Sequence, residues 1–133
     1  MKRAHEATWV EDDKPFREVA FQLDSYFAGA LKEFDLPLAP KGTEFQAGVW
    51  NALTKIPYAE TWSYGELAAY IGNPKASRAV GAANGLNPIP VIIPCHRVIG
   101  ANGKLTGFGG GLDTKEYLIG LEAESINPGL KFA

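Results

Sequence analysis

Apolar residues recur at helical spacing along much of this 133-residue chain. The first such stretch predicts a helix over residues 15–31, with Pro15 suited to the first turn. The segment 36–42 follows as an extended linker, because its prolines remove backbone donors and bias their predecessors away from helix. The apolar face of the first helix is expected to comprise Phe16, Val19, Ala20, Leu23, Phe27 and Leu31.

Three capping boxes predict further helix starts, at Thr43 with Gln46, at Ser63 with Glu66 and at Asp113 with Glu116. The helix after Thr43 carries an apolar stripe that Pro57 ends, and we expect that stripe in the core. Its members are Phe45, Val49, Trp50, Leu53 and Ile56. The last helix is expected to turn Tyr117, Leu118 and Leu121 inward, with Glu122 near its end.

Residues 63–85 have the layout of a helix-turn-helix. A short helix through Leu67, Ala68 and Tyr70 leads to the turn Gly72-Asn73-Pro74, and Pro74 begins a second helix that stops at Gly85. Small residues surround Arg78 in that helix, as close approach to a narrow minor groove requires. A helix packed tightly in the core explains the small residues equally well, so the residues alone leave both interpretations open.

The apolar run 91–93 predicts a short buried strand that leads into Pro94-Cys95-His96-Arg97-Val98. This segment holds the one cysteine of the chain beside a histidine. A thiolate is a strong nucleophile, and a nearby base favours it. Adjacent residues on a strand point to opposite faces, so a direct Cys95–His96 pair needs a turn after Pro94. An inert core cysteine is the competing interpretation.

Composition and charge narrow the class of protein. With 46% hydrophobic residues, the chain can bury one core, and the elements predict a mainly α fold, a winged-helix-like helix-turn-helix domain with a few short strands. No apolar run approaches the ~20 residues of a membrane span, and the N-terminus does not resemble a signal peptide. A single cysteine cannot form an internal disulfide, which fits a protein in a reducing cytoplasm. The two histidines are far apart, and no metal site is expected.

The net charge of −2 is unevenly distributed. Residues 61–110 carry only one acidic side chain, Glu66, against the four basic residues Lys75, Arg78, Arg97 and Lys104. This excess of basic residues is a modest footprint for a nucleic acid, and an ordinary solvated face has the same composition.

Several ordered motifs give the chain a family resemblance over roughly residues 16–124. The chain resembles the O6-alkylguanine-DNA alkyltransferases, also called methylated-DNA–protein-cysteine methyltransferases. Each motif is weak alone, and their order and spacing together are specific. They are Ser63-Tyr64-Gly65-Glu66-Leu67-Ala68, Gly72-Asn73-Pro74-Lys75-Ala76-Ser77-Arg78-Ala79-Val80-Gly81, Asn87-Pro88-Ile89-Pro90, Ile93-Pro94-Cys95-His96-Arg97-Val98 and Gly109-Gly110-Gly111-Leu112.

The resemblance implies DNA repair by direct damage reversal, with duplex DNA containing O6-alkylguanine as the partner. Proteins of this family bind the minor groove, flip the damaged guanine and take its alkyl group irreversibly onto a cysteine, without a cofactor. Cys95 matches that acceptor, and His96 matches its base, which acts through a water. Glu122 matches the residue that orients the histidine, and Tyr64 the residue that supplies a proton to the leaving guanine.

Further positions follow from the same resemblance. Arg78 matches the arginine that fills the gap in the stack, and Asn87 matches the asparagine that ties the helix-turn-helix to the active-site turn. Backbone groups near Val98 and Gly109 are expected to line the guanine pocket. Phe108 stands where many relatives carry tyrosine, which we expect to alter the substrate range. The other DNA-contacting positions implied are Ala76, Ser77, Ala79 and Gly81.

The resemblance also divides the chain, into a remnant of an N-terminal domain at residues 1–42, the active-site domain at 43–124 and a tail at 125–133. The helix at 16–31 then lacks its usual partner, and we expect self-association through it.

Two other classes of protein stay open. Alkyltransferase-like proteins bind lesions without transfer and flag them for other repair systems, but they typically have tryptophan where this chain has Cys95. A thiol hydrolase, or a winged-helix DNA binder with an inert cysteine, is the other.

Overall fold

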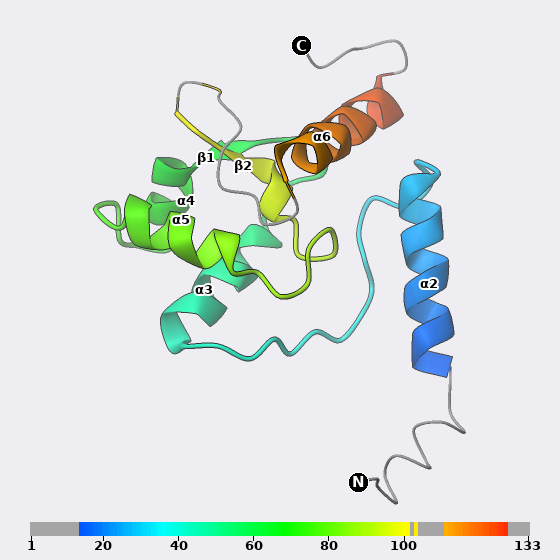
Figure 1. The fold of residues 1–133 in the computed structure, drawn as a ribbon, viewed down its shortest axis with the longest axis horizontal. Helices are drawn as coiled ribbons and strands as arrows, with labels where there is room; N and C mark the ends of the chain where they lie inside the picture. Colours follow the sequence, from blue (N-terminus) through cyan, green and yellow to red (C-terminus); the bar gives the residue numbers. More distant parts are fainter. Residues whose placement is uncertain (1–13, 102, 104–110, 128–133) are drawn as a thin grey trace, which may run out of the picture. The chain divides into compact units, whose positions relative to one another are not determined.

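The computed structural model describes residues 14–101, 103 and 111–127 (Figure 1). The chain divides into two compact units, Met1–Pro37 and Leu38–Ala133, each of which is described by itself. The predicted domain limits at 42/43 and 124/125 stay predictions. No helix in the described ranges is long and apolar enough to cross a membrane.

The first unit contains α2, Lys14–Phe27. The predicted helix over 15–31 therefore ends too late by four residues, and Gly29 is the reason. Gly29 takes a positive φ of 78° and donates to Tyr26 O, while Ala30 donates to Ser25 O, which is the hydrogen-bond pattern of a Schellman C-cap. Beyond this cap, the Gln22 side chain binds the backbone N–H and C=O of Asp35, so the following segment folds back along the helix.

Helix α3, Glu44–Leu53, opens the second unit. The predicted capping box is confirmed, because Gln46 N donates to Thr43 Oγ1 at 3.0 Å and Thr43 N donates to Gln46 Oε1 at 2.9 Å. The expected stripe is buried at Val49, Trp50, Leu53 and Ile56, with Ile56 just past the helix end. Phe45 was wrongly assigned to the core: it lies in the first turn and is exposed.

Helices α4, Tyr64–Tyr70, and α5, Ser77–Gly85, form the helix-turn-helix (Figure 1). Ser63 caps α4 in the predicted capping box with Glu66. The second helix does not begin at Pro74, as predicted, because Gly72 turns the chain at φ 84° and Ala76 N donates back to Asn73 O. Helix α5 includes Gly85 and ends with Leu86 as its C-cap, so Gly85 does not act as a left-handed cap.

A small parallel sheet brings the helix-turn-helix to the segment around Cys95. Strand β1, Trp62–Ser63, pairs with β2, Val98–Ile99, in the register Trp62↔Val98 and Ser63↔Ile99. The strand predicted at 91–93 is wrong. Those residues form a turn in which Val91 has a φ of 75°, closed by an isolated bridge between Pro90 and Ile93.

Helix α6, Leu112–Ile126, completes the second unit. The capping box predicted at Asp113 is wrong, because Gly111 is the N-cap and Asp113 lies inside the first turn. Tyr117 was predicted to face inward but is exposed, and Leu121 is half-buried. The buried face of the helix instead comprises Lys115, Leu118, Ile119 and Glu122, at the i, i+3, i+4, i+7 spacing of one stripe.

The core of the second unit lies where α3, α4 and α5 meet the segment that carries Cys95. Its apolar members include Val49, Leu53, Leu67, Val80 and Val98. The Trp50 indole adds a buried hydrogen bond to Ala83 O at 2.9 Å, which ties α3 to α5. The mainly α helix-turn-helix fold with short strands is thus confirmed.

Candidate active site

Cys95 begins a one-turn 3₁₀ helix, η1, Cys95–Arg97. Pro94 precedes it, and Arg97 N donates to Pro94 O at 3.0 Å. The turn that the sequence analysis required after Pro94 is therefore present, and it is what allows Cys95 and His96 to be used together. All three residues of η1 are buried.

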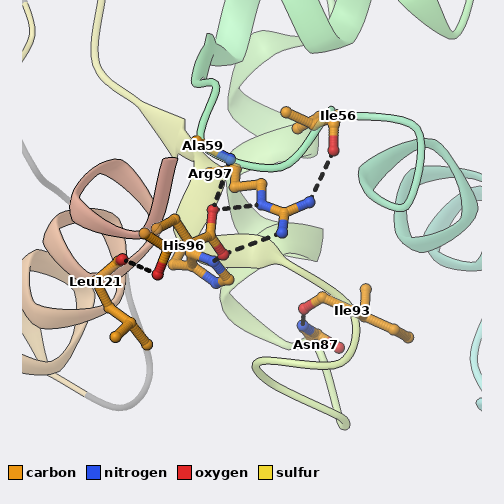
Figure 2. A network of polar contacts seen from close by, with 9 residues as sticks. Ile56, Ala59, Asn87, Ile93, His96, Arg97 and Leu121 are labelled. Atoms are coloured by element: carbon orange, nitrogen blue, oxygen red, sulfur yellow. Dashed lines mark hydrogen bonds and ion pairs between the residues drawn. The ribbon is translucent and has the colours of Figure 1, made fainter. Parts of the chain in front are cut away.

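Two asparagines hold this turn, Asn84 in the last turn of α5 and Asn87 just after the helix. Asn87 Nδ2 donates to Ile93 O at 2.8 Å (Figure 2). Asn87 Oδ1 accepts from Ile89 N at 3.0 Å. Asn84, itself buried, donates a longer bond of 3.4 Å to Cys95 O. The backbone that delivers the thiol is thereby fastened to the second helix of the helix-turn-helix, as the resemblance implied for Asn87.

The Cys95 thiol is 3% exposed and lies in the core cluster. Burial raises the pKa of Cys95, while a hydrogen bond from Asn87 and the charge of Lys115 lower it in part. Because burial is the largest of these effects, the resting form at neutral pH is the thiol. A base must therefore take the proton before the sulfur can act as a nucleophile.

His96 and Glu122 form a buried pair. His96 Nε2 lies 2.6 Å from Glu122 Oε2, and both side chains are almost fully inaccessible to solvent. Burial lowers the pKa of His96, although the hydrogen bond to Glu122 raises it in part. His96 Nδ1 is buried and has no hydrogen-bond partner among the described residues.

The ionisation state of Glu122 decides which nitrogen of His96 carries the proton. Burial alone raises the pKa of Glu122, but hydrogen bonds from His96 and Arg97 outweigh it and lower the pKa to about 2. An ionised carboxylate only accepts, so His96 must carry its proton on Nε2. The lone pair of Nδ1 is then the available basic site on the ring.

Tyr64 is the first residue of α4 and packs beneath α5. A Cβ added to Gly81 would lie 3.7 Å from the Tyr64 ring, so the glycine permits the close approach of the two helices. On α6, Lys115 Nζ lies 5.9 Å from the centroid of the same ring. The half-buried Tyr64 ring thus lies close to α5 on one side and to Lys115 of α6.

The residues expected to contact DNA lie at the start and along the exposed side of α5. Arg78 and Ala79 are exposed, and Ser77 and Gly81 are half-buried. Ala76 is the N-cap and precedes the helix. In the expected pocket, Val98 has a fully buried side chain, so it can offer only backbone groups there. Phe108 and Gly109 lie outside the described residues.

The elements of this site match one family over most of the chain. Residues 44–124 match the 6-O-methylguanine DNA methyltransferase DNA-binding domain, and residues 1–40 match the ribonuclease-like domain of the same family. The chain belongs to the 6-O-methylguanine DNA methyltransferase family.

Individual relatives agree. The methylated-DNA–protein-cysteine methyltransferase of Methanosarcina acetivorans is 67% identical over 115 residues, which cover 86% of this chain and 74% of the relative. The structure of Mycobacterium tuberculosis OGT in complex with DNA superposes with a TM-score of 0.81 at 59% identity, over 83% of this chain and 67% of the other. S. pombe Atl1, solved with damaged DNA containing O6-carboxymethylguanine, is 32% identical with a TM-score of 0.52, over 60% of this chain and 76% of the other.

Two buried cations in this methyltransferase were not singled out by the sequence analysis. Arg97 binds Glu122 through two nitrogens, whereas the sequence analysis named it only in a motif and among the basic residues of 61–110. Lys115 is 0% exposed, and burial lowers its pKa to about 8. Its spacing from Leu118, Ile119 and Glu122 is the signal that could have placed it on the inward face. The described residues contain no cluster of three or more His, Cys, Asp or Glu side chains able to hold a metal ion.

Proposed function

We propose that this methyltransferase repairs duplex DNA by moving the alkyl group of O6-alkylguanine onto Cys95, once per molecule. The observation that carries the proposal is the buried His96–Glu122 pair, 2.6 Å apart, directly beside the single cysteine of the chain. A nucleophile, a base and a residue that orients the base are thus adjacent, in the arrangement of a hydrolase triad. The methyltransferase relatives support the same reaction.

The transfer begins with the thiol proton. His96 Nδ1 accepts it through a bridging water, which leaves a Cys95 thiolate and an imidazolium stabilised by Glu122. The thiolate attacks the alkyl carbon, so the S–C bond forms while the C–O6 bond breaks and its electron pair goes to the guanine. The Tyr64 hydroxyl gives a proton to the guanine, and solvent returns the proton from His96 to Tyr64. The product is a thioether, which ends the activity of that molecule.

DNA binding is assigned to α5. Its exposed Arg78 enters the stack where the flipped base left, which offsets part of an unstacking cost of a few kcal/mol. The small residues around Arg78 let the helix backbone approach the minor groove. The complex of M. tuberculosis OGT with DNA supports a duplex as the partner. A free thiol of this kind works in a reducing compartment, so we propose a cytoplasmic location.

Lesion binding without transfer is the second candidate function, and it is not favoured. The likeness to S. pombe Atl1 at 32% identity is weaker than the likeness to the methyltransferases at 67% and 59%. Cys95 stands at the position expected for the acceptor, so the chemistry of transfer is available.

Intact-protein mass measurement tests the proposal directly. The protein is incubated with a duplex carrying one O6-methylguanine, and the modified peptide is mapped. We expect one added methyl group on the Cys95 peptide, saturating at one per molecule, and none in Cys95→Ala, which should still bind the duplex. A lesion-selective complex with no added mass would favour the second candidate function instead.

A further inference from the structure

Arg97 contacts three different groups through its guanidinium. Its Nε donates to Glu122 Oε1 at 2.9 Å, its Nη2 donates to Glu122 Oε2 at 3.0 Å, and its Nη1 donates to Ile56 O at 2.8 Å (Figure 2). The guanidinium carbon also lies 5.4 Å from the centroid of the Tyr58 ring. Arg97 is 7% exposed, so these are contacts of a buried cation held on several sides.

Arg97, Ala59 and His96 together donate to both carboxylate oxygens of Glu122. Oε1 accepts from Arg97 Nε and from Ala59 N at 3.0 Å. Oε2 accepts from Arg97 Nη2 and from His96 Nε2. The guanidinium and the imidazole therefore share one carboxylate oxygen, and each oxygen has two donors. A carboxylate bound in this way has a fixed orientation, and with its pKa lowered to about 2 it is ionised at neutral pH.

We propose that Arg97 is a positioning residue for alkyl transfer, which holds the Glu122 carboxylate so that His96 keeps its proton on Nε2 and leaves Nδ1 free to accept the thiol proton. This inference rests on the proposed function. The bidentate guanidinium holds Glu122 as an anion that only accepts, and this fixes the tautomer of His96. The proton taken from Cys95 then stays on the imidazole and does not pass on to Glu122.

Arg97 also counteracts the basicity that Glu122 gives to His96. The groups that face His96 are Glu122 and Lys115 from α6, and Cys95 and Arg97 from η1. The carboxylate raises the pKa of His96, whereas burial and the charges of Arg97 and Lys115 lower it. Without the Arg97 charge, the ring takes up a proton at a higher pH and loses the lone pair that the reaction needs.

The test compares Arg97→Met and Arg97→Lys with the wild-type protein, and Lys55→Met serves as a matched control that removes an exposed cation. The rate of alkyl transfer from free O6-benzylguanine is measured between pH 5.5 and 9, after thermal unfolding shows that each variant is folded. The rate of Cys95 alkylation by iodoacetamide is measured over the same range. This second reaction reports on thiol activation by His96 and needs no guanine.

We expect Arg97→Met to lower both rates at pH 7 on the order of 10- to 100-fold, by analogy with the loss of a group that orients a metal-ligating histidine. Relative to the wild type at the same pH, both rates should recover in part toward pH 9, because His96 becomes neutral again there. Arg97→Lys keeps the charge, so its pH profile should stay near that of the wild type while its rate is lower. Equal slowing at every pH, or no slowing, would overturn the proposal.

Two measurements apply where alkyl transfer from guanine or the Arg97→Met variant fails. If the wild-type protein takes no alkyl group from guanine, the proposed function fails, and the iodoacetamide profile still decides the role of Arg97. If Arg97→Met does not fold, ¹⁵N NMR of wild-type histidines decides, with His5→Gln used for assignment. We expect a neutral His96 protonated at Nε2 from pH 6 to 9. A proton on Nδ1 in that range overturns the inference.

Discussion

Ala59 donates its backbone N–H to Glu122 Oε1 at 3.0 Å from a left-handed conformation, with φ 67°. A residue with a Cβ is strained in this region, at a cost of about 1–3 kcal/mol. The strain is tolerated because the N–H reaches a buried carboxylate that needs it. The segment before β1 thus takes a strained conformation that places the Ala59 N–H on the Glu122 carboxylate, which also binds His96.

Replacement of Ala59 separates strain from hydrogen bonding. Ala59→Gly should leave the free energy of unfolding unchanged or raise it by up to about 1 kcal/mol, because glycine adopts positive φ without strain but loses more backbone entropy. Ala59→Val should lower it, since a β-branched residue tolerates this conformation poorly. Urea denaturation at pH 7 measures both. A valine variant as stable as the wild type would contradict this account.

The low pKa of Glu122 predicts how stability depends on acid. In the folded protein this pKa is about 2, against 4.5 for the free group. The stabilisation is therefore fully present above about pH 5 and is lost as the pH falls toward 2, and it amounts to roughly 3 kcal/mol. Urea denaturation at pH 3 to 7 measures it, and Glu122→Gln should be less stable at pH 7 and flatter over this window. An equally steep pH dependence in Glu122→Gln would contradict the assignment.

We expect Lys115 to lower the stability of the folded protein at pH 7 and to raise the reactivity of the Cys95 thiol. Burial lowers its pKa to about 8 from 10.5, so the folded protein binds this proton less tightly than the unfolded chain, and stability from this group rises between pH 8 and 10.5. Lys115→Met should therefore unfold at a higher temperature at pH 7, since a buried charge is replaced by an apolar chain. It should also slow alkylation of Cys95 by iodoacetamide at pH 8, because the Lys115 charge lowers the pKa of Cys95.

Lys55→Met is the matched control for Lys115, because Lys55 is exposed. It should change neither the melting temperature nor the alkylation rate measurably. A Lys115→Met protein that is less stable than the wild type would show that the lysine is a net structural support.

Arg78 should matter more for alkyl transfer from duplex DNA than for transfer from the free base. Arg78→Ala should slow transfer from O6-methylguanine in a duplex more than transfer from free O6-benzylguanine, because only the duplex has a stack to be filled. Single-turnover rates with the two substrates measure this difference. Equal slowing with both would rule out a role at the extrahelical base.

The sequence predicted best what short-range physics decides. The capping boxes at Thr43 and Ser63 are both present, because each links groups three residues apart. The same pattern failed at Asp113, since Gly111 takes the N-cap with a φ of 98° and leaves Asp113 in the first turn. A spacing rule cannot tell which of two nearby residues will cap.

Contacts between residues far apart in the sequence decide which side chains of α6 are buried. Lys115 and Glu122 face inward although they are charged, and Tyr117 faces outward although it is aromatic. Glu122 can be buried only because Arg97, His96 and Ala59 supply donors from distant parts of the chain. The resemblance identified Glu122, but no periodicity in the sequence could have revealed that Arg97 shares it.

Helix α5 carries Arg78 and also fixes how far Arg78 lies from the Cys95 turn. Arg78 stands near its start and Asn84 near its end, six residues or about 9 Å apart along the axis. Asn84 and Asn87 fasten that end to the Cys95 turn. The helix therefore fixes the separation between the exposed Arg78 and the turn that carries the sulfur. These six residues make about 1.7 helical turns, so the length of α5 sets how far Arg78 lies from the Cys95 turn. One inserted residue would rotate the two ends by about 100° relative to each other and leave a correctly built site facing the wrong way.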